Sequence, residues 1–273
     1  MELIVFDLDG TLLNNASQIS PFTKETLSLL TEKNIAYTIA TGRTLHSAQD
    51  IIEGYEFHLP HIYSNGVITW DPKTNTLSLD NLLTVAEATH IIDTTLAQGV
   101  TPFVTSIDKN NNHFIYHPEV AHEAERRLLN LFHIRPSAKV LPIEDMPSDA
   151  QITNISMLGT ASDIDAIEQR LSRKPSLISY SGPALEGDGL KWMDIHHSDA
   201  NKGGAVSSLK QQLGASKIIC FGDNDNDLSM FELADECYAP ENANDNVKAA
   251  ATKVIGHHHA DGVAIQLRER FNL

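Results

Sequence analysis

The chain has 273 residues, enough for one large domain or two domains of ordinary size. Hydrophobic residues make up 41% of it and charged residues 21%, which excludes a disordered chain and indicates a globular protein. The 36 aspartates and glutamates outnumber the 20 lysines and arginines, and the formal net charge of -16 would repel nucleic acid and anionic membranes. We therefore expect neither as a partner, and any bound phosphate must be held by a local arrangement of donors.

The first part of the chain alternates strands with helices. An apolar strand is expected over 3–6, and a helix follows that begins at Pro21 with Ser20 as its N-cap. The apolar face expected for this helix consists of Phe22, Thr26, Leu29 and Leu30. Further strands are expected over 35–40 and 61–63, before a hairpin-like stretch that ends at Leu79. This alternation predicts a doubly wound α/β fold with a parallel sheet.

The pattern changes after about Leu83. Helices are expected over 85–98, 119–132 and 162–172, and short, half-polar strands over 102–107, 113–117, 154–158, 177–180 and 192–196. Half-polar strands predict a sheet with one open face. We interpret 83–189 as an α+β domain inserted into a core formed by 1–82 and 190–273.

The strand and helix alternation returns from Asn201. A stripe of Ala205, Leu209 and Leu213 predicts a helix that ends at Gly214, and the next strand is expected over 217–221. Short strands near 237–239 and 253–255 complete the predicted sheet.

The two cysteines, Cys220 and Cys237, lie in apolar stretches and are expected to be reduced core thiols, which favours the cytoplasm. Asp7 and Asp9 interrupt the first apolar run, so no signal peptide is expected, and no stretch approaches membrane-spanning length. The pattern does not specify an oligomeric state.

The pentapeptide Asp7-Leu8-Asp9-Gly10-Thr11 directly follows the first strand. Because side chains alternate along a strand, Asp7 and Asp9 start on the same side, and Gly10 lets the backbone turn away. Carboxylates about 4 Å apart repel by roughly 4 kcal/mol at an effective dielectric of about 20. A cation or a shared proton would relieve this repulsion, and both serve phosphoryl chemistry. The alternative is an ordinary Asp-rich turn.

Four polar clusters stand at the carboxyl ends of expected strands or at the start of a helix. They are Asp7 to Thr11, Thr41-Gly42-Arg43, Asn201-Lys202-Gly203 and Gly222 to Asp227. Ligands of open α/β sheets bind at the carboxyl edge of the strands, so we expect the four clusters to form one site.

The acidic cluster at Gly222 to Asp227 first suggests a calcium-binding EF-hand loop. That reading fails, because the sixth position would be Leu228 instead of glycine and the twelfth Ala234 instead of glutamate. A strand that leads into the cluster would instead bring Asp223 close to Asp7 and Asp9. Several carboxylates around one hard cation favour Mg²⁺. An acidic surface turn is the alternative.

Lys202 is expected at the start of a helix, where free amides already favour an anion. Its ammonium group would balance both the carboxylates and a phosphate, although a lone lysine at such a place is usually a solvated surface charge. Thr41 and Gly42 offer a hydroxyl and an unobstructed amide, the components of a small phosphate cradle.

The histidine run His257 to His259 lies inside the chain. Adjacent residues point in different directions, so we expect a surface loop here in preference to a metal site.

With these four clusters in this order, the chain resembles the haloacid dehalogenase (HAD) superfamily of phosphatases, and in particular its Cof-like, IIB branch. The resemblance covers nearly the whole chain. Further stretches similar to this branch are Ser64-Asn65-Gly66, Asn242-Ala243, Val247-Lys248 and Asp261-Gly262-Val263-Ala264.

The resemblance implies a role for each residue of the site. Asp7 would be the nucleophile that forms an aspartyl-phosphate, and Asp9 the general acid and then the general base. Mg²⁺ would be held by the Asp7 carboxylate, the Asp9 main-chain carbonyl and Asp223, with support from Asp227. The phosphate oxygens would be met by the Leu8 amide, Thr41, Gly42, Lys202 and Asn226, with Arg43 as a weaker candidate that could instead pair with a nearby acid.

The implied activity is Mg²⁺-dependent hydrolysis of a small phosphorylated metabolite, such as a sugar phosphate or a phosphorylated cofactor. Asp9 argues against dehalogenation, because a halide leaves without a proton whereas an alkoxide needs an acid. The inserted block would be a cap that contacts the rest of the substrate. A phosphomutase or other phosphotransferase and, less favoured, a non-enzymatic regulator that binds a phosphometabolite are the alternatives.

Overall fold

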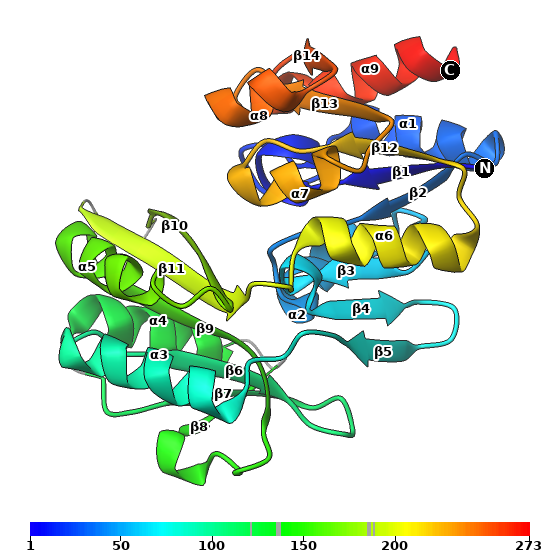
Figure 1. Cartoon of the computed structure of the whole chain (residues 1–273). Helices are drawn as coiled ribbons and strands as arrows, with labels where there is room; N and C mark the ends of the chain where they lie inside the picture. The colour runs from blue at the N-terminus through cyan, green and yellow to red at the C-terminus, as the bar shows by residue number, and fades with distance from the viewer. Residues whose placement is uncertain (121, 135–137, 185–186, 188) are drawn as a thin grey trace. The chain divides into compact units, whose positions relative to one another are not determined.

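The computed structural model describes residues 1–120, 122–134, 138–184, 187 and 189–273 (Figure 1). The chain divides into two compact units. We call Met1–Asp80 together with Ala200–Leu273 the core unit, and Asn81–Asp199 the inserted unit. Among the described residues, no helix has both the length and the apolar character that a membrane crossing requires.

The core unit contains strands and helices in alternation. Its strands are β1 (Glu2–Phe6), β2 (Ala36–Ile39), β3 (His61–Tyr63), β4 (Ile68–Asp71), β5 (Thr76–Leu79), β12 (Lys217–Phe221), β13 (Glu236–Pro240) and β14 (Lys253–Ile255). Its helices are α1 (Pro21–Glu32), α2 (Leu45–Ile52), α6 (Lys202–Leu213), α7 (Leu228–Phe231), α8 (Asp245–Ala250) and α9 (Gly262–Phe271).

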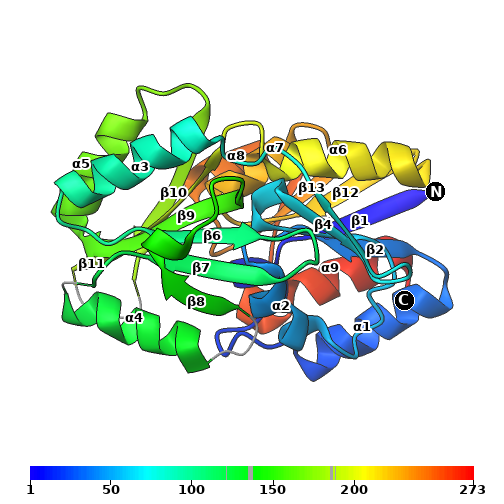
Figure 2. The same cartoon turned by 90° about the horizontal axis from the view of Figure 1, so that it is seen from below.

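The main sheet of the core unit has the strand order β14-β13-β12-β1-β2, and all its neighbouring strands are parallel. Helices α1 and α9 cover one face, and α6 and α7 cover the other (Figures 1 and 2). This confirms the predicted α/β fold. Phe6 at the end of β1 pairs with Phe221 at the end of β12 and with Ile39 at the end of β2. The residues that follow these three strands therefore meet at one edge.

The hairpin predicted before Leu79 is confirmed, as β4 and β5 are antiparallel. They form a separate small sheet with β3, which is antiparallel to β4. Only an isolated parallel bridge between Ala40 and Ile62 connects β3 to the end of β2 within the described chain.

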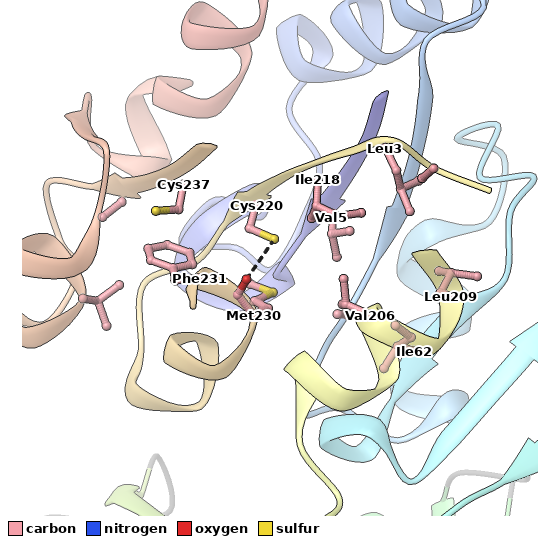
Figure 3. Packing of buried hydrophobic residues seen from close by; sticks show 14 of the residues in the cluster. Leu3, Val5, Ile62, Val206, Leu209, Ile218, Cys220, Met230, Phe231 and Cys237 are labelled. Atoms are coloured by element: carbon pink, nitrogen blue, oxygen red, sulfur yellow. Dashed lines mark hydrogen bonds between the residues drawn. The ribbon is translucent and has the colours of Figure 1, made fainter. Parts of the chain in front are cut away.

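A buried apolar cluster lies between the main sheet and helices α6 and α7. Leu3 and Val5 of β1 share it with Val206 and Leu209 of α6 (Figure 3). Two residues of α7, Met230 and Phe231, extend the same cluster, as do both cysteines. The cysteines are free and buried, as predicted, and the Cys220 thiol donates a hydrogen bond to the Met230 carbonyl at 3.6 Å. This packing fixes β1 and β12 against the helix that carries Lys202.

Helix α1 begins as predicted, at Pro21 with Ser20 as N-cap; the Ser20 hydroxyl accepts a hydrogen bond from the Thr23 amide at 3.0 Å. Its buried face differs in part from the prediction and consists of Thr23, Thr26, Leu27 and Leu30. Phe22 is only half-buried, and its ring packs under the Arg268 guanidinium of α9, at 4.0 Å from the ring centre.

The inserted unit contains one larger sheet with the strand order β10-β11-β9-β6-β7-β8. Its strands are β6 (Phe103–Ile107), β7 (His113–His117), β8 (Lys139–Pro142), β9 (Gln151–Thr160), β10 (Leu177–Pro183) and β11 (Leu190–His197). Its helices are α3 (Val85–Ala97), α4 (Glu123–Ile134) and α5 (Ala161–Leu171). Strand β8 was not predicted, and β9 is longer than the strand predicted over 154–158.

The prediction of one open sheet face is too simple. Val104 of β6 lies in the apolar cluster that Ile91 of α3 and Ile164 of α5 share. The adjacent Phe103 points to the other face, where its ring contacts Phe132 of α4 with the ring centres 5.4 Å apart. Figure 2 shows α4 on the side of this sheet opposite to α3 and α5. Both faces are therefore covered at β6.

The inserted unit extends beyond the expected range of 83–189, because β11 belongs to its sheet. Met193 of β11 pairs with Met157 of β9 on one side and with Ser181 of β10 on the other. A strand between two others cannot be separated from their domain, so the compact unit continues to Asp199.

Candidate active site

Three carboxylates meet at the carboxyl edge of the main sheet. Asp7 follows β1, and its amide donates to the Phe221 carbonyl at the end of β12 at 2.9 Å. Asp223 follows β12, and Asp227 lies one turn further along the chain. Each of the three side chains offers an oxygen within 4.8 Å of the others. The structure thus brings the first and last sequence clusters together.

Lys202 lies between two of these carboxylates. Its ammonium nitrogen is 2.6 Å from Asp7 Oδ1 and 2.6 Å from Asp227 Oδ1, and its side chain is 0% exposed. Burial alone would lower the pKa of this lysine, but Asp227 and Asp7 outweigh it and raise the pKa above its ordinary value. Lys202 is therefore a buried ammonium group paired with two carboxylates and not a solvated surface lysine.

Asp227 is held on both of its oxygens. While Oδ1 accepts from Lys202, Oδ2 accepts from the amides of Asp223 and Asn224 at 2.8 and 3.0 Å. Gly222 makes this close approach possible, because a Cβ there would lie 2.6 Å from the Asp227 Cβ. Asp227 thus fixes both the lysine and the loop that carries Asp223.

Asp223 sits against the loop that follows β1. The Thr11 hydroxyl donates to Asp223 Oδ1 at 2.9 Å. Gly10 has a φ of +76°, and a Cβ at this position would be 2.3 Å from Asp223 Oδ2. The glycine in the pentapeptide is required both by its left-handed backbone and by the carboxylate beside it.

The cluster carries more negative than positive charge. Burial, and after it Asp227, raise the pKa of Asp223 to about 7. Burial also raises the pKa of Asp7, with Lys202 acting in the opposite sense and Asp227 and Asp223 adding to the increase. Three carboxylates face one ammonium group, and a divalent cation would neutralise the excess negative charge. Carboxylate oxygens are also the ligands that Mg²⁺ prefers, so the donor set fits such an ion.

The side chain of Asp9 lies outside this cluster and is 51% exposed. Its two oxygens each accept from the Arg43 guanidinium at 2.6 Å, a paired arrangement from Nε and Nη2. Arg43 also donates to the Ser47 carbonyl at 3.2 Å. The structure thus pairs Arg43 with the nearby acid, which was the alternative to phosphate binding.

The remaining sequence candidates lie at the same edge. Thr41 is buried, and its hydroxyl accepts from the Arg43 amide at 3.1 Å. Gly42 lies beside Asn65, because a Cβ at this glycine would be 3.2 Å from Asn65 Oδ1. The side-chain Nδ2 of Asn226 donates a hydrogen bond to the same oxygen at 2.9 Å. Within the described chain, Asn226 Oδ1 is buried without a hydrogen-bond partner. Leu8 is buried, and its carbonyl accepts a hydrogen bond from the Leu13 main-chain amide at 2.9 Å.

Asn65 and Asn242 belong to this edge although neither was among the predicted site residues. Asn65 bonds to Asn226 as above, while Asn242 donates to the Gly10 carbonyl at 2.8 Å. Both asparagines follow strands, β3 and β13 respectively. The signal that identified the other clusters, polar residues at the end of a strand, applies to these two as well.

Comparison with known proteins identifies the family of the chain. The model of the haloacid dehalogenase-like hydrolases matches residues 4–267. The chain is 27% identical to the pyridoxal phosphate phosphatase YbhA of Escherichia coli, with 96% of both chains covered. It is 26% identical to the 5-amino-6-(5-phospho-D-ribitylamino)uracil phosphatase YitU of Bacillus subtilis, over 99% of this chain and 98% of that protein.

Among solved structures, the HAD subclass IIB sugar phosphatase BT4131 has the same fold. The TM-score is 0.79 at 19% identity, with 100% of this chain and 99% of that chain covered. The family match over nearly the whole length shows that the chain belongs to the haloacid dehalogenase-like hydrolases.

Proposed function

We propose that the protein hydrolyses a small phosphate monoester in a Mg²⁺-dependent reaction that passes through an aspartyl-phosphate at Asp7. The observation that carries this proposal is the buried contact of Lys202 with Asp7 and Asp227, with the Asp223 carboxylate beside it. Clustered like charges are costly to bury, and a purely structural site has no need of them.

Asp7 is the proposed nucleophile. Its backbone is tied to β12, and Lys202 holds its Oδ1, so the carboxylate has a fixed position. Its other oxygen attacks phosphorus, and the bond from phosphorus to the ester oxygen breaks. Water then displaces Asp7 from phosphorus, which releases inorganic phosphate and restores the carboxylate.

Asp9 is the proposed general acid and base. It protonates the leaving alkoxide in the first step and removes a proton from the attacking water in the second. Because Arg43 binds both oxygens of Asp9, we propose that Arg43 positions this carboxyl group and does not bind the phosphate directly. The exposure of Asp9 leaves room for a substrate oxygen beside it.

Mg²⁺ would be held by the carboxylates of Asp7 and Asp223 and by the main-chain carbonyl of Asp9. When bound, it would neutralise the negative charge of the phosphate and of the carboxylates. Asp227 supports this arrangement through its bonds to Lys202 and to the Asp223 amide.

The phosphate oxygens would be bound by groups of the same edge. We propose the Leu8 and Gly42 amides, the Thr41 hydroxyl, Lys202 and Asn226 for this role. Backbone amides and one ammonium group bind a phosphate locally, as a chain with a net charge of -16 requires.

For the substrate we propose a phosphorylated sugar, sugar alcohol or cofactor. The named relatives act on pyridoxal phosphate and on a phosphoribitylamino-uracil, both of them small phosphate esters. The inserted unit, which occupies the position of a cap in the sequence, is proposed to contact the part of the substrate that differs between such esters.

A phosphate-release screen with Mg²⁺ over sugar phosphates, flavin mononucleotide, nucleotides and pyridoxal phosphate tests this proposal. Asp7→Asn should lower kcat at least about 10³-fold on the best substrate, because the variant lacks the nucleophile. The matched control Asp50→Asn, on the exposed side of α2, should retain full activity. Full activity of Asp7→Asn, or activity that survives a strong chelator, would contradict the mechanism.

A further inference from the structure

The histidine run His257 to His259 lies in a tight surface turn between β14 and α9. The amides of Ala260 and Gly262 both donate to the His257 carbonyl, at 3.0 and 3.2 Å, so the chain folds back on itself here. Asp261 has a φ of +59°, which allows the chain to enter α9 directly after the turn. The predicted surface loop is therefore present.

The same turn brings the three imidazole rings together, contrary to the expectation that adjacent side chains diverge. The ring centres of His257 and His259 are 4.0 Å apart, those of His257 and His258 4.8 Å, and those of His258 and His259 5.5 Å. One nitrogen of each ring lies within 4.8 Å of the others. Three nitrogens at about 2.0–2.1 Å from a tetrahedral metal ion are roughly 3.4 Å apart, so small side-chain rotations suffice.

One ring nitrogen of His258 is held by a main-chain carbonyl. Its Nδ1 is 2.6 Å from the Leu13 carbonyl oxygen, and since a carbonyl only accepts, Nδ1 carries the proton. In the neutral ring the lone pair is therefore on the other nitrogen, Nε2. In metal-binding histidines, the ring nitrogen that does not bind the metal usually donates a hydrogen bond to a carbonyl or carboxylate, and this bond fixes the orientation of the ring.

We propose that His257, His258 and His259 bind a divalent transition-metal ion of the Zn²⁺ type, with water completing its coordination. Imidazole nitrogen suits Zn²⁺, Ni²⁺ and Co²⁺ and is a poor ligand for Mg²⁺. This site is therefore chemically distinct from the carboxylate cluster at Asp7, Asp223 and Asp227, which offers oxygen alone.

The histidine turn is connected to the loop that follows β1. The His258 amide donates to Asn242 Oδ1 at 3.2 Å, while Asn242 Nδ2 donates to the Gly10 carbonyl at 2.8 Å. With the bond from His258 to Leu13, this makes two links between the turn and that loop. An ion held by the three rings would restrain the turn and, through it, the loop.

Equilibrium dialysis of the full chain without an affinity tag, against Zn²⁺ in excess Mg²⁺, tests the proposal. Excess Mg²⁺ competes for the oxygen ligands of the carboxylate cluster, and the part of the Zn²⁺ binding that depends on His257 and His259 reports on the histidines. We expect one Zn²⁺ per chain, and at least about tenfold weaker binding by His257→Gln/His259→Gln, which leaves the His258 bond to Leu13 in place. The control His58→Gln, at an exposed histidine elsewhere, should bind as the wild type does.

Two further measurements use the same three proteins. Co²⁺ should give the intense visible absorption of a tetrahedral nitrogen site in the wild type and in His58→Gln, but not in the double variant. Zn²⁺ should raise the Tm of the same two proteins only, because a ligand that binds the folded state stabilises it. Equal Zn²⁺ affinity in all three proteins would overturn the proposal. Dialysis of a fourth protein, Asp223→Asn, would overturn it as well if this variant lost Zn²⁺ binding while the double variant kept it.

Discussion

Charged side chains lie at both edges of the core sheet. At one edge the acidic side chains are paired with basic ones, and at the other the acidic side chains are in excess. At the amino ends of the strands, Glu2 of β1, Lys217 of β12 and Glu236 of β13 lie together. At the carboxyl ends of the same strands β1 and β12 lie Asp7 and Asp223. The strands and the residue types are similar, so the difference between the edges lies in how the charges are paired.

At the amino edge both Glu2 and Glu236 are paired with basic side chains. Arg270 of α9 binds Glu236 through two nitrogens, each 2.9 Å from an oxygen, and Glu2 at 3.1 Å, while Lys217 contacts both glutamates. Hydrogen bonds from Arg270, and after them from Lys217 and Tyr238, lower the pKa of Glu236 to about 2 against the cost of partial burial. At the carboxyl edge the pKa of Asp223 instead rises to about 7. Paired charges stabilise the fold, whereas the unbalanced ones indicate a site for a ligand.

Removal of the buried ammonium group should cost the most stability. In Lys202→Met, Asp7 and Asp227 lose their shared partner in the interior, and we expect a loss of about 3–5 kcal/mol in the free energy of unfolding. Urea denaturation measures this value. Lys210→Met, half-exposed on the same helix, should change it by less than about 0.5 kcal/mol. A similar small effect of both substitutions would mean that the carboxyl edge is not held by this lysine.

In metal-free protein, Asp223→Asn should raise the free energy of unfolding, whereas Lys202→Met lowers it. Since the folded-state pKa of Asp223, about 7, is above the ordinary 3.8, the wild type loses stability as the pH rises between these values. At pH 8 with chelator we expect the variant to be more stable by about 1–3 kcal/mol, although it should be inactive. The gain should disappear below about pH 4, where the carboxyl is protonated in the folded and unfolded chain. A variant that is less stable than the wild type at pH 8 would contradict the charge excess.

Glu236→Gln should show the smallest effect and the reverse pH dependence. The folded-state pKa of about 2 lies below the ordinary 4.5, so Glu236 contributes stability above pH 4.5, and this contribution is lost as the pH falls towards 2. We expect the variant to be less stable by about 1–2 kcal/mol at pH 7 and equal to the wild type near pH 2. Thermal unfolding across this range measures the difference. A loss that persists unchanged at the lowest pH would have a cause other than the ion pairs.

The strands of the core could be predicted from the sequence because their apolar runs are short and end in polar clusters. The strand at 217–221 has the predicted bounds, and so does the strand at 253–255. Strand β8 was missed, since Lys139–Pro142 is half-exposed and carries no apolar alternation. The boundary at the end of the inserted unit depends on which strands pair with β11. The residues of β11 alone do not indicate that its partners are β9 and β10.

The candidate site, too, has features that could be predicted from the sequence and features that could not. That Asp7, Lys202, Asp223 and Asp227 meet follows from their positions at strand ends and at a helix start, which a parallel sheet brings to one edge. The partner of Arg43 depends on side-chain orientation across two loops, which spacing does not specify. The convergence of three adjacent histidines depends in turn on a tight turn with a left-handed residue, and their sequence favours divergence.

The central claim, that the unbalanced edge carries a nucleophile, can be tested directly by trapping the phosphorylated side chain. The protein is mixed with its best substrate and Mg²⁺, quenched within one turnover and reduced with borohydride, which converts an aspartyl-phosphate into homoserine. Peptide mass spectrometry then locates the modified residue. The mechanism predicts homoserine at position 7 in the wild type and none in Asp7→Asn. Modification at Asp9 or Asp223, or turnover without any reduced aspartate, would contradict it.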